Sequence, residues 1–275
     1  MVIPWGILAG EGELFFSPTG KSALCGLDEK KFVIAVATMA ARISNEADSD
    51  GIPVVAVNRF AELEENGCAI YNRVWGNYAP PEFSEGFAVR ITGEADFRFD
   101  REIRGTVTGI SRLPVKAPIP ENGIIMIIRE MPSPDRLSIK LGSSLVLRIR
   151  ISPSLQTAIG GGPRIVRKNE YSIELGRENF GPGHSFYIKN SRHPRSAVGL
   201  GPEGRYMYLV VVEGRSNESR GMNMPELARL LVSLGASEAM AFDGGRSVSM
   251  YIDGKEVVEG DRKMADALGV FAIEK

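Results

Sequence analysis

The chain is poor in the residues that build metal centres and disulfide frameworks. Its cysteines, Cys25 and Cys68, have no Cys-x-x-Cys spacing, and its histidines, His184 and His193, form no His-Glu-x-x-His pattern. We therefore expect no cofactor, although a divalent cation stays open as an alternative. Free cysteine is among the most buried residue types, so two buried thiols are expected; a disulfide would need an oxidising compartment.

An excess of charge of either sign is also absent. The 33 basic and 34 acidic side chains give a formal net charge of -1. Nucleic-acid-binding domains commonly carry a basic excess, so we expect no nucleic-acid partner. The strongest apolar runs, Phe32–Ala41 and Ile124–Ile128, are shorter than the roughly 18 residues of a membrane-spanning helix, so we expect no membrane span.

A cationic segment ahead of an apolar stretch is missing at the N-terminus, so no signal peptide is visible. The compartment stays open between an intracellular protein and one whose leader was removed. The sequence leaves the oligomeric state open as well.

Short β-rich segments fill the first half of the chain and alternate with prolines, which fix φ and cannot donate to a sheet ladder. The segment Glu29–Ile43 is predicted as a helix, although its β-branched residues lower the helix propensity. The predicted strands are Ile52–Val57, Cys68–Arg73, Gly86–Thr92, Ile103–Ile110, Gly123–Arg129 and Leu145–Ile151.

The second half begins with two predicted strands, Ser196–Leu200 and Arg205–Glu213, joined by a Gly-Pro-Glu-Gly turn. The match to Gly-x-Gly-x-x-Gly at 199–204 therefore marks a hairpin turn, because no helix follows it. The clearest helix follows Asn223, which can cap it, with Pro225 in the first turn and Glu226 completing a capping box. Its apolar stripe consists of Leu227, Leu230, Leu231 and Leu234.

The predicted fold is of the α+β class, with mixed β-sheets and a few helices. Later strands are predicted at Glu238–Phe242, at Ser247–Ile252 and Lys255–Val258 as a hairpin, and at Leu268–Ile273. We divide the chain into a β-rich N-terminal region, 1–151, whose independence is open, and a region 152–275 that holds the candidate chemistry.

Two carboxylates lie at the ends of strands in the strand–loop–helix–strand unit 206–245. Such a unit usually joins parallel strands, so Glu213 and Asp243 leave the sheet at the same edge, where ligands bind in open sheets. Gly214 follows the first acid, and Gly244 with Gly245 follows the second, which lets a ligand approach closely. The alternative is that Asp243 is a turn residue and Glu213 a solvated strand end.

Cationic side chains gather around the same segments. They are Arg192, His193 and Arg195 before one strand, Arg215 after Glu213, and Arg246 after the double glycine. Arginine stays charged and binds phosphate bidentately, so the group suits an anionic substrate. Scattered solvated charge is the alternative, and His193 beside a proline can be a structural residue instead of a proton donor.

The order and spacing of these segments resemble the phosphodiester glycosidase family, which includes many bacterial envelope proteins. The resemblance rests on His193–Gly199, Val212–Arg215, Ser219–Ala228, Leu234–Ala236 and Ala241–Ser247. Ala158–Pro163, with Gly161 and Gly162, resembles the family's glycine segment, and Val57-Asn58-Arg59 resembles the N-terminal part of its bacterial branch.

The resemblance implies hydrolysis of a sugar-1-phosphodiester to a sugar and a phosphomonoester. It implies a catalytic role for Asp243, Glu213 and Arg195. The residues that we expect to bind substrate are Arg192, His193, Arg215, Gly244, Gly245, Arg246, Ser219, Gly161, Gly162, Asn58 and Arg262. The implied partner is a small-molecule or glycan phosphodiester, and the implied setting is carbohydrate metabolism outside the cell or in its envelope.

The chain departs from the family pattern at three places. Arg246 stands where the family usually has a third glycine, Glu213 where it usually has aspartate, and Glu259-Gly-Asp-Arg262 where Asn-x-Pro-Ser is common. A non-catalytic carbohydrate-binding or envelope-binding module and a metal-dependent phosphoesterase are therefore kept as alternatives to the glycosidase.

Overall fold

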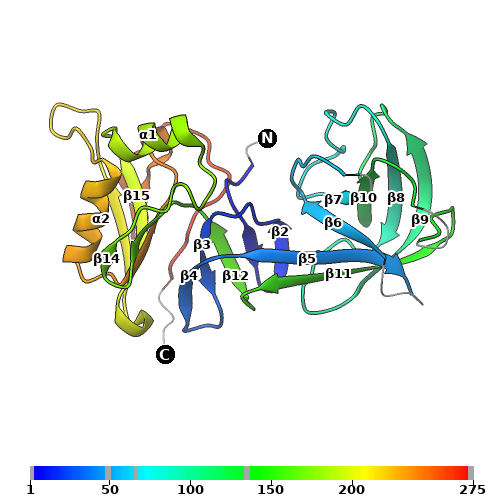
Figure 1. Cartoon of the computed structure of the whole chain (residues 1–275), viewed down its shortest axis with the longest axis horizontal. Helices are drawn as coiled ribbons and strands as arrows, with labels where there is room; N and C mark the ends of the chain where they lie inside the picture. The colour runs from blue at the N-terminus through cyan, green and yellow to red at the C-terminus, as the bar shows by residue number, and fades with distance from the viewer. Residues whose placement is uncertain (1–2, 47–50, 65–66, 133–136, 272–275) are drawn as a thin grey trace. The chain divides into compact units, whose positions relative to one another are not determined.

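The computed structural model describes residues 3–46, 51–64, 67–132 and 137–271 (Figure 1). Its contacts divide the chain into two compact units. One, here called the layered unit, combines Met1–Ile7, Pro18–Ala37 and Ala158–Lys275; the other, the barrel unit, combines Leu8–Ser17 and Thr38–Thr157. The layered unit therefore draws on both ends of the chain, and the division of the chain into regions 1–151 and 152–275 stays a prediction.

The barrel unit is built on a closed barrel in the strand order β10-β7-β6-β5-β11-β9-β8. Its strands are β5 (Thr38–Asn45), β6 (Ile52–Val57), β7 (Cys68–Tyr71), β8 (Phe87–Gly93), β9 (Ile103–Arg112), β10 (Gly123–Ile128) and β11 (Ser144–Ser152). Neighbouring strands pair antiparallel except β6 and β7, which are parallel. The unit also holds the antiparallel pair β1 (Leu8–Gly10) and β2 (Glu13–Phe16).

Strand β10 lies in the core of the barrel unit. All of its residues are buried, which explains why its sequence is a continuous apolar run instead of an alternating one. Ile125 and Ile127 pack with Ala69, Tyr71 and other buried residues in one apolar cluster.

The layered unit contains a five-stranded sheet in the order β14-β13-β17-β15-β16. Its strands are β13 (Arg164–Arg167), β14 (Glu170–Tyr171), β15 (Arg195–Leu200), β16 (Met207–Val212) and β17 (Glu238–Ala241). The remaining elements are the strands β3 (Ser22–Gly26), β4 (Phe32–Val36) and β12 (Thr157–Gly160), the helices α1 (Pro182–Asn190) and α2 (Met224–Ser233), and the hairpin of β18 (Met250–Ile252) and β19 (Lys255–Val258). Two short 3-10 helices, η1 (Pro202–Gly204) and η2 (Gly245–Ser247), complete the described part of the unit.

Both faces of the sheet in the layered unit are covered by an apolar layer, because side chains of β15 and β17 point alternately to one face and the other. Ala197 and Ala239 pack with Leu227 and other α2 residues on one face, and Figure 1 shows α2 lying against this sheet. Val198, Leu200 and Met240 pack on the other face, against Leu24 of β3 and Ile34 of β4. Successive side chains of a strand point to opposite faces, so both layers follow from the sequence of β15 and β17.

The topology sets which loops meet. Both β16 and β17 pair antiparallel with β15, which lies between them, so β16 and β17 run parallel and end at the same edge. This confirms the predicted crossover. Helix α2 is confirmed too, with its capping box between Asn223 and Glu226.

Two predicted elements were wrong. The segment Glu29–Ile43 forms β4 and part of β5 instead of a helix, because each strand pairs along its length with a neighbour, β3 or β11. Leu268–Phe271 is not a strand, and Ile273 lies outside the described residues. Helix α1 was not predicted. Strands predominate, with few helices, and the barrel itself was not foreseen.

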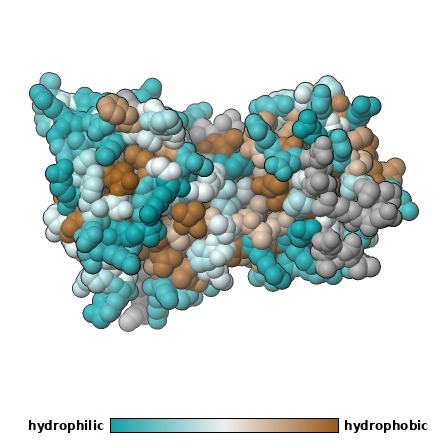
Figure 2. Space-filling view, in the orientation of Figure 1, coloured by the Kyte–Doolittle hydropathy of each residue, from teal (hydrophilic) through white to brown (hydrophobic). Residues whose placement is uncertain are grey.

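Both cysteines are free and buried, as expected. Burial raises the pKa of Cys25 to about 11 and raises that of Cys68 further. Among the described residues, no helix is long and apolar enough to cross a membrane. On the face drawn in Figure 2, hydrophilic residues cover much of each unit, broken by smaller hydrophobic patches.

Candidate active site

The loops that follow β16 and β17 meet at Pro194, just before β15. The Gly245 N–H donates to the Pro194 carbonyl at 2.9 Å, and a Cβ placed on Gly214 would come within 2.9 Å of the Pro194 nitrogen. The Arg215 guanidinium lies against Gly245, with Nη2 3.3 Å from the position of a Cβ there. The convergence expected from the parallel strands is therefore present.

The Asp243 carboxylate is held at the start of this glycine turn. Its Oδ1 accepts a hydrogen bond from the Gly244 N–H at 2.9 Å, and its Oδ2 lies 3.7 Å from Nη1 of Arg262. The Ser196 hydroxyl donates to the Asp243 carbonyl at 2.7 Å, which ties the turn to β15. The side chain is 53% exposed, so an oriented carboxylate with a cationic neighbour is open to a ligand.

Glu213 lies at the end of the parallel strand but is not held in the same way. Its side chain is exposed, and its carboxylate has no hydrogen bond or ion pair among the described residues. Its carbonyl accepts from the Ser219 hydroxyl at 2.6 Å, and that hydroxyl accepts from the Gly221 N–H at 3.2 Å. Ser219 thus closes the loop, and the catalytic role of Glu213 stays a prediction.

Arg195 is buried, and its guanidinium donates hydrogen bonds to backbone carbonyls. Its Nε donates to the Met222 carbonyl at 2.9 Å, and its Nη2 donates to the carbonyls of Ile188 and Ser191 at 3.0 and 2.7 Å. These bonds join the end of α1, the start of β15 and the loop before α2. Its Nη1 faces Gly244, lying 3.8 Å from a Cβ built there. The structure thus gives Arg195 a scaffolding position behind the glycine turn.

Arg192 and Arg246 are bound to other protein groups. Arg192 pairs with Glu226 of the α2 capping box and donates to the Gly221 carbonyl at 2.9 Å. Arg246 Nε lies 2.8 Å from Asp261 Oδ1, and this bond lowers the pKa of the Asp261 carboxyl. Both guanidinium groups therefore stabilise the loops around the turn.

His193 and Arg215 form a contact beside the turn. Arg215 Nη2 and His193 Nδ1 are 3.1 Å apart, and because a guanidinium has only donors, Nδ1 is assigned as the acceptor. Burial lowers the pKa of His193, and the nearby charges of Arg195 and Arg215 lower it further. The imidazole is consequently neutral near pH 7 and aligns Arg215.

The glycine segment 160–162 packs beside the end of β17. The Gly162 N–H donates to the Ala241 carbonyl at 2.8 Å, and the Gly161 N–H donates to the Ser22 carbonyl at 2.9 Å. Gly162 thus supports the strand that leads to Asp243, and Gly161 ties the segment to β3.

Asn58 has no group open to a ligand. It lies in the barrel unit and is 0% exposed. Its Nδ2 donates to the carbonyl of Phe15 and to Oδ1 of Asn72, both at 2.8 Å, and its Oδ1 accepts from the Asn72 N–H at 2.9 Å. Here the structure departs from the sequence expectation, because the amide is used inside the unit's core.

Asp266 was missed by the sequence reasoning. It is half-buried, and burial raises the pKa of its carboxyl, with the charge of Asp243 raising it further. No spacing rule connects a residue in the irregular C-terminal segment to the end of β17, so no sequence signal pointed to it.

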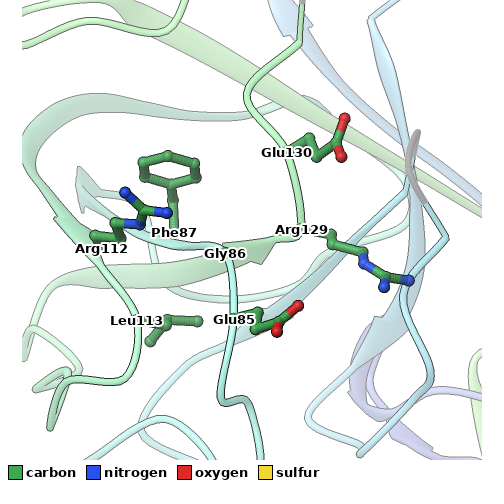
Figure 3. A pocket seen from close by; sticks show the side chains of 7 residues that line it. All are labelled: Glu85, Gly86, Phe87, Arg112, Leu113, Arg129 and Glu130. Carbon is green, nitrogen blue, oxygen red and sulfur yellow. The ribbon is translucent and has the colours of Figure 1, made fainter.

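A pocket of about 470 Å³ lies in the barrel unit (Figure 3). Its lining residues are Glu85, Gly86, Phe87, Arg112, Leu113, Arg129 and Glu130. The labelled guanidinium groups of Arg112 and Arg129 point in different directions in Figure 3, so they do not converge on one anion. In the described part of the chain, no group of three or more His, Cys, Asp or Glu side chains is arranged to hold a metal ion.

A family described as phosphodiester glycosidase matches residues 102–271. That range includes Glu213, Asp243, Arg262 and Asp266 and excludes Asn58. Among curated proteins, the SPbeta prophage-derived uncharacterized protein YomE of Bacillus subtilis (strain 168) is 34% identical over 68 residues, which are 25% of this chain and 10% of that protein.

Two solved structures share the fold. A hypothetical protein from Synechocystis aligns with a TM-score of 0.73 and 21% identity over 93% of this chain and 45% of its own. A protein from Burkholderia pseudomallei K96243 aligns with a TM-score of 0.69 and 17% identity over 92% of this chain and 57% of its own. The chain thus spans about half the length of these relatives and a tenth of the curated one.

Proposed function

Because this chain belongs to the phosphodiester glycosidase family, we propose that it hydrolyses the bond between the anomeric carbon of a sugar and the phosphate of a phosphodiester. The products are the free sugar and a phosphomonoester. The observation that supports this most strongly is the Asp243 carboxylate at the glycine turn, with Arg262 beside it and Arg215 against Gly245.

Asp243 takes the role of the carboxylate at the anomeric carbon. Glycosidases use such a group either as the nucleophile or as the base that activates water. The Gly244 N–H orients this carboxylate, and Arg262 lies beside it. Glu213, exposed at the end of the parallel strand, orients sugar hydroxyl groups in this proposal.

The arginines have separate tasks. Phosphate gains negative charge as its oxygen leaves the anomeric carbon, so guanidinium groups at that position lower the barrier. Arg215 and Arg262 are assigned to this charge because both lie at the turn. Arg192, Arg195 and Arg246 are engaged with protein groups and act by holding the loops.

The test is turnover of sugar-1-phosphodiesters by the wild-type chain and by Asp243→Asn. We expect the substitution to lower kcat/KM by at least about a hundredfold, since it removes the reacting carboxylate. Its circular dichroism and melting temperature should match the wild type. Asp253→Asn is the matched control, because Asp253 lies in the β18–β19 turn and asparagine accepts its φ of 50°. Full activity of Asp243→Asn rejects the assignment.

Oxygen-18 water separates the glycosidase from its alternatives. Label in the sugar indicates cleavage of the C–O bond, as proposed. Label in the phosphate together with loss of activity in a chelator indicates a metal-dependent phosphoesterase. Saturable binding of the diesters without turnover indicates a carbohydrate-binding module that uses the same loops.

A further inference from the structure

The segment 259–262 is bound to the turn after β17 through Arg246 and Asp261. Arg246 Nε donates to Asp261 Oδ1 at 2.8 Å, and its Nη2 donates to the Asp261 carbonyl at 3.4 Å. The Asp261 N–H in turn donates to the Arg246 carbonyl at 3.2 Å. These side-chain and backbone hydrogen bonds are here called the 246–261 clasp.

The backbones of the two segments pack closely beside the clasp. A Cβ built on Gly260 would lie 3.0 Å from the Val248 carbonyl oxygen and 3.3 Å from that of Arg246. Arg246 itself lies in the 3-10 helix η2. Helical dihedrals are open to any residue except proline, so the turn accommodates an arginine where the family usually has glycine.

The clasp leads directly to the candidate catalytic carboxylate. Arg262 follows Asp261 in the chain, and its Nη1 lies 3.7 Å from Asp243 Oδ2. Arg246 comes three residues after Asp243. The contact between 243 and 262 and the clasp therefore close a ring through two short stretches of backbone. Such a ring limits the positions that the Arg262 guanidinium can reach.

We propose that Arg246 is a positioning residue, whose clasp with Asp261 holds the Arg262 guanidinium at Asp243 for the phosphate of the substrate. This inference rests on the proposed function. A long side chain loses rotamer freedom when it binds a ligand, and a guanidinium that is already in place avoids part of that cost. Arg246 acts through Asp261 in this role and does not itself bind the phosphate.

A direct phosphate contact by Arg246 makes the opposite prediction for Asp261→Asn. In that case Asp261 would compete with phosphate for the guanidinium, and the substitution would tighten phosphate binding. In the positioning role, the same substitution weakens the clasp and therefore weakens phosphate binding. The comparison is made at physiological ionic strength, which screens exposed charges over about 8 Å.

The first experiment does not depend on turnover. It measures hydrogen exchange of the Asp261 amide and the affinity for inorganic phosphate. In Arg246→Ala we expect this amide to exchange at least about tenfold faster and phosphate to bind more weakly, while the melting temperature stays close to that of the wild type, since exposed ion pairs add little stability. Asp261→Asn should weaken phosphate binding as well.

Arg205→Ala is the matched control, because it removes an equally exposed ion pair, with Glu203, at the helix η1. It should leave both readouts unchanged. The inference is overturned if Arg246→Ala changes neither the exchange nor the affinity, or if Asp261→Asn binds phosphate more tightly.

The second experiment is a double-mutant cycle on the kinetics. Arg246→Ala should lower kcat by about tenfold with a smaller effect on KM, because the charge on the leaving phosphate develops in the transition state. Arg246→Lys should stay impaired, since an ammonium lacks the planar fork of the guanidinium. In the background of Arg262→Gln, Arg246→Ala should cause no further loss.

Failure of this inference differs from failure of the proposed function. Diester turnover with losses that add in the double variant overturns the positioning role and leaves the hydrolase in place. Absence of turnover, with amide exchange and phosphate affinity that change as expected, overturns the hydrolase and supports the clasp as the device that positions Arg262.

Discussion

Gly162 shows how close packing fixes one residue near the candidate site. Its φ is +104°, and a Cβ there would meet Glu178 Oε2 at 2.4 Å. Glu178 cannot easily move, since its buried carboxylate accepts from the Ser22 N–H and hydroxyl and from the Arg164 N–H. We expect Gly162→Ala to lower the free energy of unfolding by about 1–3 kcal/mol, measured by urea denaturation.

Gly176→Ala is the control for that change. A Cβ at Gly176 meets nothing within 4 Å, so its effect should stay within about 0.5 kcal/mol. Similar losses at both positions would show that local strain at Gly162 is not the cause.

The residues of the candidate site were only partly predictable. The approach of Arg215 to the glycine turn follows from parallel strands that end at one edge, whereas only the family pattern pointed to Arg262. The partners of Arg192 and Arg195 could not be foreseen, because they are a capping glutamate and backbone carbonyls whose positions depend on how α1 and α2 pack. Nothing in the sequence connects Asp266 with Asp243.

The loop that holds Arg215 leads into helix α2. A capping box stabilises the N-terminus of this helix. Asn223 Oδ1 accepts from the Glu226 N–H at 2.9 Å, and Glu226 Oε2 accepts from the Asn223 N–H at 3.0 Å. Asn223→Ala leaves a helix donor unsatisfied, so we expect a loss of about 1 kcal/mol in chemical denaturation. Asn217→Ala, in the exposed loop before the helix, should change little; an equal loss would argue against the cap.

The segment after β14 is tied back to the end of β13 through Glu174. Its buried carboxylate accepts from Arg167 Nε and Nη2 at 2.6 and 2.8 Å. The Arg167 hydrogen bonds lower the pKa of this carboxyl in the folded protein. A lowered pKa adds stability above the unfolded value of about 4.3, and this stability is lost as pH falls through the folded value.

Glu174→Gln should therefore be less stable than the wild type at pH 7, by about 1–3 kcal/mol. The difference should shrink in acid, where the wild-type carboxylate is protonated as well. Urea denaturation at pH 7 and near pH 3 measures both. Glu170→Gln, on the exposed strand β14, should follow the wild type at both pH values. A gap for Glu174→Gln that does not change with pH would contradict the assignment.

The elements differ in how well sequence describes them. Helix α2 combines a cap, a proline in the first turn and an apolar stripe, so local signals agree with the fold. The segment of β4 and β5 is rich in alanine, and its local sequence favours a helix. Its pairing with β3 and β11 overrides that preference, since β propensity depends on the neighbouring strands.

At the scale of the whole molecule, barrel closure depends on distant pairings. Strand β8 pairs with β10, and β6 pairs in parallel with β7. The periodicity of apolar residues predicts a strand but does not predict which strand it pairs with. The layered unit also depends on pairs distant in sequence, because it includes β3 and β4 from the N-terminal half of the chain. Individual strands were therefore predictable, while their assembly was not.

This recruitment predicts that residues 152–275 alone do not form a stable unit. Without β3 and β4, the face of Val198, Leu200 and Met240 loses its cover from Leu24 and Ile34. Each exposed side chain of this size costs about 1.5–3 kcal/mol, comparable in sum with the stability of a small domain. The buried carboxylate of Glu178 also loses the donors of Ser22.

We expect the 152–275 fragment to bind a hydrophobic dye and to unfold without a cooperative transition. The full chain should show a cooperative transition under the same conditions. A fragment in which residues 18–37 are joined to 158–275 by a flexible linker should regain the transition, because the linker restores β3 and β4 to the sheet face they cover. Cooperative unfolding of 152–275 alone, with chemical shifts for Val198 and Met240 like those of the full chain, would show that the C-terminal region needs neither strand.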